Sequence, residues 1–326
     1  MNPNELLNAQ LEYGLAGDFE NGLRICRELE KIDPDNIRAA FNRGWYRLRE
    51  GHLYEGSTLM DYGRHIDVFG NRHIGTKKPV LRLGQKGDVH LALEGGLGDE
   101  IYAIRFIDIF KPTSVSCDRS LFPIVKEFGV TVCESTAAHG LDYDYWVPAM
   151  SANSILKYEY EDVKGNAYIS KTADTVKGRV GVRWVGNPKF EHQQHRIFPK
   201  ELMFDAVEDL SPVSLQRDTD DVPDWMEQPS LETWEETRKV ISSCELVITS
   251  CTSIAHLAGA MGVETWVIVP ILPYYLWALP TNTTPHYDSV TLFRQEKYGC
   301  WEAPFMKIKS ELNHVIERKI ECLAIA

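Results

Sequence analysis

Residues 244–270 constrain the fold of this chain more than any other stretch of its sequence. Leu246–Thr249 form an apolar, β-branched run of strand length, and small and hydroxyl residues follow before Ile254–Met261 take up helical spacing. Gly262 ends the helix, and a second apolar run begins at Thr265. Strand, polar turn, helix and strand in this order predict a βαβ unit of a parallel sheet.

The turn between the first strand and the helix predicts a binding site for a phosphate. Backbone N–H groups at a helix N-terminus have no partner within the helix, and they carry the positive end of the helix dipole. The hydroxyls of Ser250, Thr252 and Ser253 belong to this turn, and the N–H groups of Ser253 and Ile254 begin the helix. His256 follows one turn later, where it either hydrogen-bonds the same anion or packs in the core.

Composition indicates a globular protein with reduced thiols. A chain of 326 residues with 44% hydrophobic and 10% aromatic residues can form two or three domains with ordinary cores. No apolar run approaches the roughly 20 residues that span a bilayer, and the start has no signal-peptide pattern, so we expect a cytoplasmic location. The seven cysteines include no CxxC pair, and the net charge of -12 disfavours a large nonspecific nucleic-acid surface.

The first 70 residues contain an internal repeat. Gly17 and Gly51 occupy the same place in two copies, 34 positions apart, each between two stretches of helical periodicity. This period resembles that of the tetratricopeptide repeat, with Gly44 where two helices must approach closely. Two copies are fewer than the roughly three that a free-standing array needs, so we expect residues 1–70 to pack on the following domain. Either they form a docking surface for a protein partner, or they are a structural brace.

Residues 87–177 and 178–326 each show alternating strands and helices. Two consecutive series of this kind predict an α/β protein with two facing doubly wound, Rossmann-like domains, preceded by the small helical repeat region. The main predicted elements are a strand over 89–93, a glycine-rich turn over 94–100, a helix over 101–110, a strand over 180–184, and a closing helix over 305–323.

Three stretches in this order resemble the GT-B glycosyltransferases, and in particular the heptosyltransferase-like family and its bacterial relatives that carry tetratricopeptide repeats. The stretches are 94–101 (EGGLGDEI), 180–199 (VGVRWVGNPKFEHQQHRIFP) and 245–270, with a weaker fourth at 214–216, and the resemblance covers roughly residues 89 to 293. It implies a GT-B fold in which the N-terminal domain brings the acceptor and the C-terminal domain binds a nucleotide-sugar.

The glycine-rich turn is the candidate catalytic segment. Gly95, Gly96 and Gly98 allow a tight backbone turn at the C-terminal edge of a sheet, where α/β folds bind their ligands. The resemblance implies that Asp99 in this turn is the general base that deprotonates an acceptor hydroxyl, with Glu100 as the alternative base. Aspartate also caps helices well, so a purely structural interpretation of Asp99 is open too.

The loop that follows residues 180–184 predicts contacts to the donor diphosphate. Asn187 lies just after the strand, and Lys189 and Arg196 are the cations best placed to meet a diphosphate, although both can also be solvated charges. Gln216 follows another strand, where it either reads the base or ribose of the nucleotide or is solvated.

No metal or cofactor is expected. His192 and His195 lie three residues apart on the same loop, but no Cys or carboxylate cluster completes a metal site. The resemblance implies that loop amides and cations neutralise the leaving diphosphate instead. The aromatic residues Tyr274, Tyr275 and Trp277 either stack on a sugar or base or form core between domains.

The sequence therefore predicts an inverting, metal-independent glycosyltransferase that moves a sugar from a nucleotide-sugar to a hydroxyl of a glycan, a protein or a modified nucleobase. One alternative is a noncatalytic scaffold whose repeats bind a partner and whose glycosyltransferase-like part is a relic. Another is an enzyme that glycosylates modified bases in phage DNA. For that enzyme, a modest basic patch is formed by Lys77, Lys78, Arg82 and Lys86.

Overall fold

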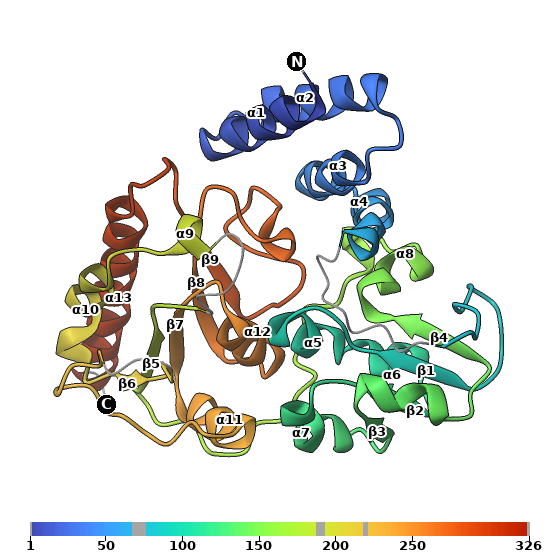
Figure 1. Cartoon of the computed structure of the whole chain (residues 1–326). Coiled ribbons are helices and arrows are strands. Elements are labelled where there is room, and N and C mark those ends of the chain that lie inside the picture. The colour runs from blue at the N-terminus through green and yellow to red at the C-terminus, as the bar shows by residue number, and fades with distance from the viewer. Residues whose placement is uncertain (1, 67–75, 187–192, 218–220, 325–326) are drawn as a thin grey trace.

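A computed structural model describes residues 2–66, 76–186, 193–217 and 221–324, with side chains described up to residue 313. Two parallel sheets lie side by side, and a group of N-terminal helices lies across one end of both (Figure 1). Within these residues, no helix is both long enough and apolar enough to cross a bilayer.

The N-terminal helices begin at side chains that cap them. Asn2, Asp18 and Asn36 each accept a hydrogen bond from the backbone N–H three residues later, at 2.9 to 3.1 Å. A Cβ atom on Gly44 would lie 2.9 Å from the carbonyl oxygen of Gly56, so the close helix approach predicted at Gly44 is confirmed. The elements are α1 (Pro3–Leu15), α2 (Phe19–Ile32), α3 (Ile37–Arg49), α4 (Leu53–Met60) and the 3-10 turn η1 (Asp61–His65).

These helices pack on the rest of the chain, as the sequence predicted. Leu48, Leu53 and Met60 of α3 and α4 form a buried cluster with Ala278, which belongs to the C-terminal half, and Tyr160 packs against the same cluster. The hydroxyl of Tyr160 donates to the carbonyl oxygen of Leu48 at 3.2 Å. The repeat region is therefore anchored to both halves of the α/β part.

The first sheet has four parallel strands in the order β3-β2-β1-β4. All four residues of its strand β1 are buried, which is typical of a parallel strand covered on both faces. Its strands are β1 (Val89–Ala92), β2 (Ser114–Ser116), β3 (Thr131–Cys133) and β4 (Tyr145–Pro148). Its helices are α5 (Leu97–Ala103), α6 (Phe106–Phe110), α7 (Phe122–Lys126) and α8 (Ala152–Leu156).

The single helix predicted over 101–110 is two helices. Helix α5 begins earlier, at Leu97, because Gly96 takes an extended N-cap conformation and its N–H donates to the carboxylate of Asp99. The helix is interrupted after Ala103. There the guanidinium of Arg105 turns back and donates to the carbonyl oxygen of Tyr102 at 3.1 Å, and α6 starts at Phe106.

The second sheet has five parallel strands in the order β6-β5-β7-β8-β9. The predicted βαβ unit over 244–270 is confirmed as β7, α12 and β8. The strands are β5 (Val180–Arg183), β6 (Val213–Ser214), β7 (Leu246–Ser250), β8 (Glu264–Val269) and β9 (Val290–Arg294). The helices are α9 (Gln193–Arg196), α10 (Lys200–Val207), α11 (Trp234–Ser243), α12 (Ser253–Ala260) and α13 (Glu302–Ala324).

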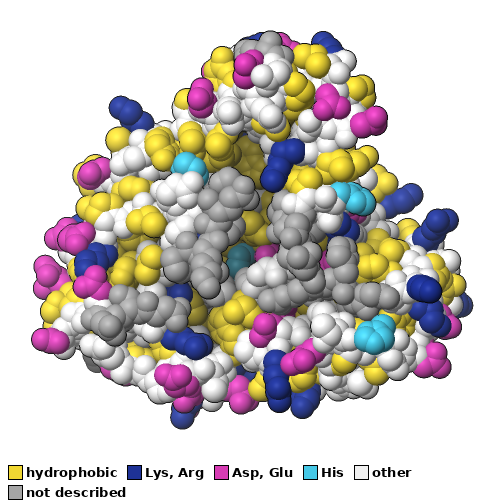
Figure 2. Space-filling model, viewed as in Figure 1, with side chains coloured by type: hydrophobic (Ala, Val, Ile, Leu, Met, Phe, Trp, Pro, Cys, Tyr) yellow, Lys and Arg dark blue, Asp and Glu magenta, His cyan; other side chains and the backbone are white. Residues whose placement is uncertain are grey.

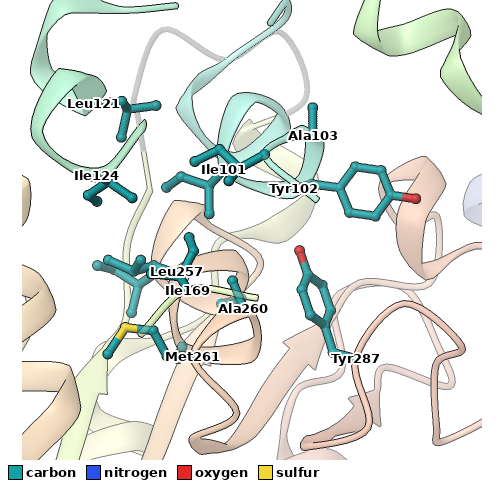
Figure 3. Close-up of a cluster of buried hydrophobic side chains, with 14 of the residues drawn as sticks. Ile101, Tyr102, Ala103, Leu121, Ile124, Ile169, Leu257, Ala260, Met261 and Tyr287 are labelled. Carbon is teal, nitrogen blue, oxygen red and sulfur yellow. The ribbon is translucent and has the colours of Figure 1, made fainter. Parts of the chain in front are cut away.

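One hydrophobic cluster runs from the first sheet to the second. Ile101 of α5 and Leu257 of α12 belong to the same buried cluster, and Figure 3 shows side chains of the two helices facing each other. An ion pair joins the same two halves at another point, where the guanidinium of Arg238 on α11, 1% exposed, binds both carboxylate oxygens of Glu127 after α7. The α/β part is therefore held together by apolar and ionic contacts between its sheets.

Candidate functional site at two helix N-termini

The first turns of helices α5 and α12 touch each other. A Cβ atom on Gly98 would lie 2.8 Å from Cδ2 of His256 and 3.5 Å from the Cα atom of Ser253, so only glycine fits at this point. Helix α5 follows strand β1 of the first sheet, and α12 follows strand β7 of the second. The glycine-rich turn and the predicted phosphate turn are thus brought together, as is expected at the carboxyl ends of parallel strands.

Asp99 lies in the first turn of α5 and is 7% exposed. Its Oδ2 accepts the N–H of Gly96 at 2.9 Å, so Asp99 supports the helix start from position N3, and the N-cap residue is Gly96 rather than Asp99. Position 95 requires glycine for two reasons. Its φ of +83° lies in the left-handed region that favours glycine, and a Cβ atom at this position would lie 2.7 Å from Oδ2 of Asp99. The turn is therefore shaped around the carboxylate.

The other carboxylate oxygen of Asp99 is bound from the second half of the chain. Its Oδ1 accepts hydrogen bonds from the hydroxyls of Tyr274 at 2.8 Å and Tyr275 at 3.3 Å. Burial raises the pKa of Asp99 above the ordinary value, and the hydrogen bonds from Tyr274 and Gly96 oppose that rise. A raised pKa makes the Asp99 carboxylate a stronger base than an exposed aspartate.

Glu100 faces away from this contact. It is fully buried, and its Oε2 accepts the N–H of Asp118 at 2.7 Å, inside the first half of the chain. This contact holds the loop after β2 against α5.

The N-terminus of α12 carries the predicted phosphate turn. Thr252 is the N-cap residue in an extended conformation, but its side chain makes no cap hydrogen bond to the helix, whose first N–H groups belong to Ser253 and Ile254. The Thr252 hydroxyl lies 3.3 Å from that of Thr249. Ser250 is 2% exposed, and its Oγ has no hydrogen-bond partner within the described part of the chain. A buried hydroxyl without a partner at a strand end is an acceptor or donor available to a ligand.

Arg196 reaches the same turn from α9. Its Nη1 donates to the carbonyl oxygen of Cys251 at 2.8 Å, and its Nε donates to Gln193. A Cβ atom on Gly186 would lie 2.6 Å from Nη2 of Arg196 and 3.1 Å from Cγ2 of Thr252, so both side chains pack against the backbone at Gly186. Burial lowers the pKa of Arg196, and the guanidinium remains a cation beside the start of α12.

Two other predicted donor residues are held by the protein itself. His256 is buried, stacks on Trp277 with ring centroids 5.1 Å apart, and shares a hydrogen bond of 3.0 Å between Nδ1 and the Tyr287 hydroxyl. Burial lowers its pKa to about 3, so this imidazole is neutral at pH 7. Gln216 is also buried, and its Oε1 accepts the N–H of Val185 at 3.1 Å, which ties the ends of β5 and β6 together.

Asn187, Lys189 and His192 lie outside the described residues. Nδ1 of His195 lies 3.0 Å from the Tyr298 hydroxyl. Within the described residues, no group of three or more His, Cys, Asp and Glu side chains is arranged to hold a metal ion.

The contact of Tyr274 and Tyr275 with Asp99 was not predicted from the sequence. Both lie in the aromatic loop, which we define as residues 271–278 between β8 and β9. The only sequence signal for this contact is the density of aromatic residues in the loop, which predicts either stacking on a sugar or base or a core between domains. The Trp277 indole N–H donates to Sγ of Cys251 at 3.0 Å, so the loop also contacts the phosphate turn.

Comparison with known proteins finds no matching family model and no matching curated protein. Two solved structures are similar in part. The bacterial iron-containing dodecameric glycosyltransferase TibC from enterotoxigenic E. coli H10407 is 13% identical over 74% of this chain and 78% of that chain, with a TM-score of 0.46. The dodecameric iron-containing heptosyltransferase TibC in complex with ADP-D-beta-D-heptose is 12% identical over 77% and 79%, with a TM-score of 0.43. Similarity at this level identifies neither an activity nor a ligand of this chain.

Proposed function

We propose that this chain is a GT-B-type glycosyltransferase that moves a sugar from a nucleotide-sugar to an acceptor hydroxyl, with inversion and without a bound metal. The observation that carries the proposal is the meeting of two helix N-termini from two sheets, with a buried carboxylate on one side and a guanidinium on the other. A group-transfer reaction with an anionic leaving group needs both, one to accept a proton and one to stabilise charge.

The donor diphosphate is assigned to the start of α12. The N–H groups of Ser253 and Ile254 begin the helix, the hydroxyls of Ser250 and Thr252 belong to the preceding turn, and the guanidinium of Arg196 is bonded to the Cys251 carbonyl oxygen in that turn. Helix N-termini and guanidinium groups bind phosphate by charge-assisted hydrogen bonds, which strengthen as negative charge grows on the leaving nucleotide. Charge neutralisation by these groups is the reason for proposing that no metal takes part.

Asp99 is assigned as the general base. In a single displacement, the acceptor oxygen attacks the anomeric carbon, the bond from that carbon to the diphosphate oxygen breaks, and the acceptor proton passes to the Asp99 carboxylate. Oδ2 accepts the N–H of Gly96, and a carboxylate oxygen has a second lone pair that can accept that proton. The acceptor is a hydroxyl of a glycan, a protein or a modified nucleobase.

A noncatalytic scaffold is the second candidate. It is favoured by one observation, that both oxygens of Asp99 already accept hydrogen bonds from the protein and the side chain is almost fully buried. For an enzyme acting on DNA, Figure 2 offers no comparable support, because on the described part of that face Lys and Arg side chains are interspersed with Asp and Glu.

The decisive experiment uses calorimetry and turnover with UDP-glucose, GDP-mannose and ADP-heptose. We expect one donor to bind, and we expect release of its nucleoside diphosphate to continue in excess EDTA. Asp99→Asn should keep the binding and lose turnover, whereas Asp108→Asn on the exposed face of α6 should keep both. Absence of binding to all three donors supports the noncatalytic scaffold, whereas binding without turnover in the unmodified protein contradicts the catalytic assignment.

A further inference from the structure

The aromatic loop is held from two sides. On one side, the hydroxyls of Tyr274 and Tyr275 donate to Asp99. On the other side lies helix α3 of the repeat region, where the indole N–H of Trp45 donates to the carbonyl oxygen of Pro273 at 2.9 Å. The residue bonded to Trp45 therefore directly precedes the residue bonded to Asp99.

Further contacts hold the two ends of the loop against the repeat region. A Cβ atom on Gly14 would lie 3.3 Å from Cδ1 of Leu272, and one on Gly17 would lie 3.0 Å from Cδ1 of Ile271. At the other end, Nη1 of Arg49 donates to the carbonyl oxygen of Ala278 at 3.3 Å. The repeats thus contact the loop along most of its length.

We infer that Trp45 is a positioning residue for Asp99: by fixing the Pro273 carbonyl, it holds the Tyr274 hydroxyl on the carboxylate. The tetratricopeptide-like helices are then part of the active-site architecture, in addition to being a brace. The effect of Trp45 on turnover rests on the proposed function, whereas its effect on the Asp99 carboxyl group does not.

Two consecutive residues, Pro273 and Tyr274, connect Trp45 to Asp99. Proline fixes its own φ, so the orientation of its carbonyl determines the direction in which the chain enters Tyr274. A hydrogen bond from Tyr274 favours the charged form of the carboxylate, and its weakening raises the pKa of the carboxyl group. Loss of the Trp45 hydrogen bond should therefore raise the pKa of Asp99 further and displace the acid limb of a pH-rate profile to higher pH.

The test variant is Trp45→Phe, which removes the N–H donor and keeps an aromatic ring next to Phe19. The pKa of Asp99 is measured by NMR on protein labelled with carboxyl-¹³C aspartate, and Asp99→Asn identifies the resonance. Trp225→Phe is the matched control, because Trp225 is a half-exposed indole that packs on Phe204 in the C-terminal half. If Trp45→Phe does not fold, the second test variant is Arg49→Met, which removes the hydrogen bond to the Ala278 carbonyl oxygen at the other end of the loop.

We expect a higher Asp99 pKa in Trp45→Phe than in the wild type, with no change in Trp225→Phe. Adding Trp45→Phe to Tyr274→Phe should change the Asp99 pKa no further, because both act through one hydrogen bond. With a donor that is turned over, kcat should fall about three- to tenfold at neutral pH and KM should stay constant. An Asp99 pKa equal to that of the wild type overturns the inference. A shifted pKa in a protein that binds no donor overturns only the proposed function.

Discussion

A Cβ atom on Gly98 would lie 2.8 Å from Cδ2 of His256, so helices α5 and α12 approach each other as closely as backbone and ring allow. His256 has no room to move away, because it is stacked on Trp277 and bonded to Tyr287. The position at which the two halves of the candidate site meet is therefore intolerant of any side chain.

Gly98→Ala should destabilise the protein by about 1 to 3 kcal/mol, the usual cost of overpacking a buried contact. Urea unfolding of the variant and the wild type measures the difference. Gly140→Ala is the control, because a Cβ atom at Gly140 meets nothing within 4 Å. Equal losses in the two variants would show that the α5 and α12 contact is not the cause.

Ser250→Ala should leave the free energy of unfolding unchanged or slightly higher, because the hydroxyl that it removes has no partner in the described protein. Binding of the nucleoside diphosphate should nevertheless weaken about tenfold, since one hydrogen bond to a charged phosphate is lost. Ser289→Ala provides the comparison. Its buried Oγ also lacks a partner among the described residues, but Ser289 lies at the amino ends of the strands, just before β9, whereas Ser250 lies at their carboxyl ends. Unaltered affinity in Ser250→Ala would remove Ser250 from the donor site.

Asp99→Asn should change the pH dependence of stability. Burial raises the pKa of Asp99, so the folded chain holds the proton more tightly than the unfolded chain does. Asp99 therefore lowers the free energy of unfolding as the pH rises from the ordinary carboxyl pKa through the raised one. The stability of the wild type minus that of Asp99→Asn should fall across this window and be constant below it. Urea unfolding at stepped pH values measures the difference, and a constant value throughout would contradict the raised pKa.

Glu127→Gln should reduce stability by about 1 to 3 kcal/mol, because the buried guanidinium of Arg238 loses its charged partner. Thermal and urea unfolding both report this loss. Glu235→Gln, an exposed carboxylate on the same helix α11 as Arg238, should change stability by no more than about 0.5 kcal/mol. If Glu127→Gln behaves like Glu235→Gln, the ion pair contributes nothing to joining the two sheets.

The parts of the fold that were predictable are those with a local pattern. The βαβ unit over 244–270 combines apolar runs, a hydroxyl turn and a terminating glycine, and each of these acts within a few residues. Strand β9 was not anticipated, because the segment before it lacks a regular helix that would mark the unit. The early start of α5 was also missed, since it depends on Gly96 serving as an N-cap for which Asp99 provides the acceptor.

The candidate site was predictable only as two separate halves. Spacing placed Asp99 and Thr252 each at the carboxyl end of a strand, and the prediction of two facing domains put the two turns on opposite sides of one site. The bond between Tyr274 and Asp99 joins residues 175 positions apart, and no local pattern specifies such a pairing. Nor could spacing show that His256 and Gln216 are bonded to the protein's own groups, because that depends on which neighbours the fold supplies.

The hydrophobic cluster that runs from one sheet into the other limits how a ligand can enter and leave the candidate site. Hinged enzymes admit and release ligands by swinging two lobes apart, but here such a swing would expose Ile101 and Leu257 to water and break the Arg238 ion pair. Lobe separation would thus cost much of the stability of the whole molecule. Under the proposed function, ligands would therefore enter and leave while the lobes stay together, and the radius of gyration in solution should be the same with and without a bound nucleotide.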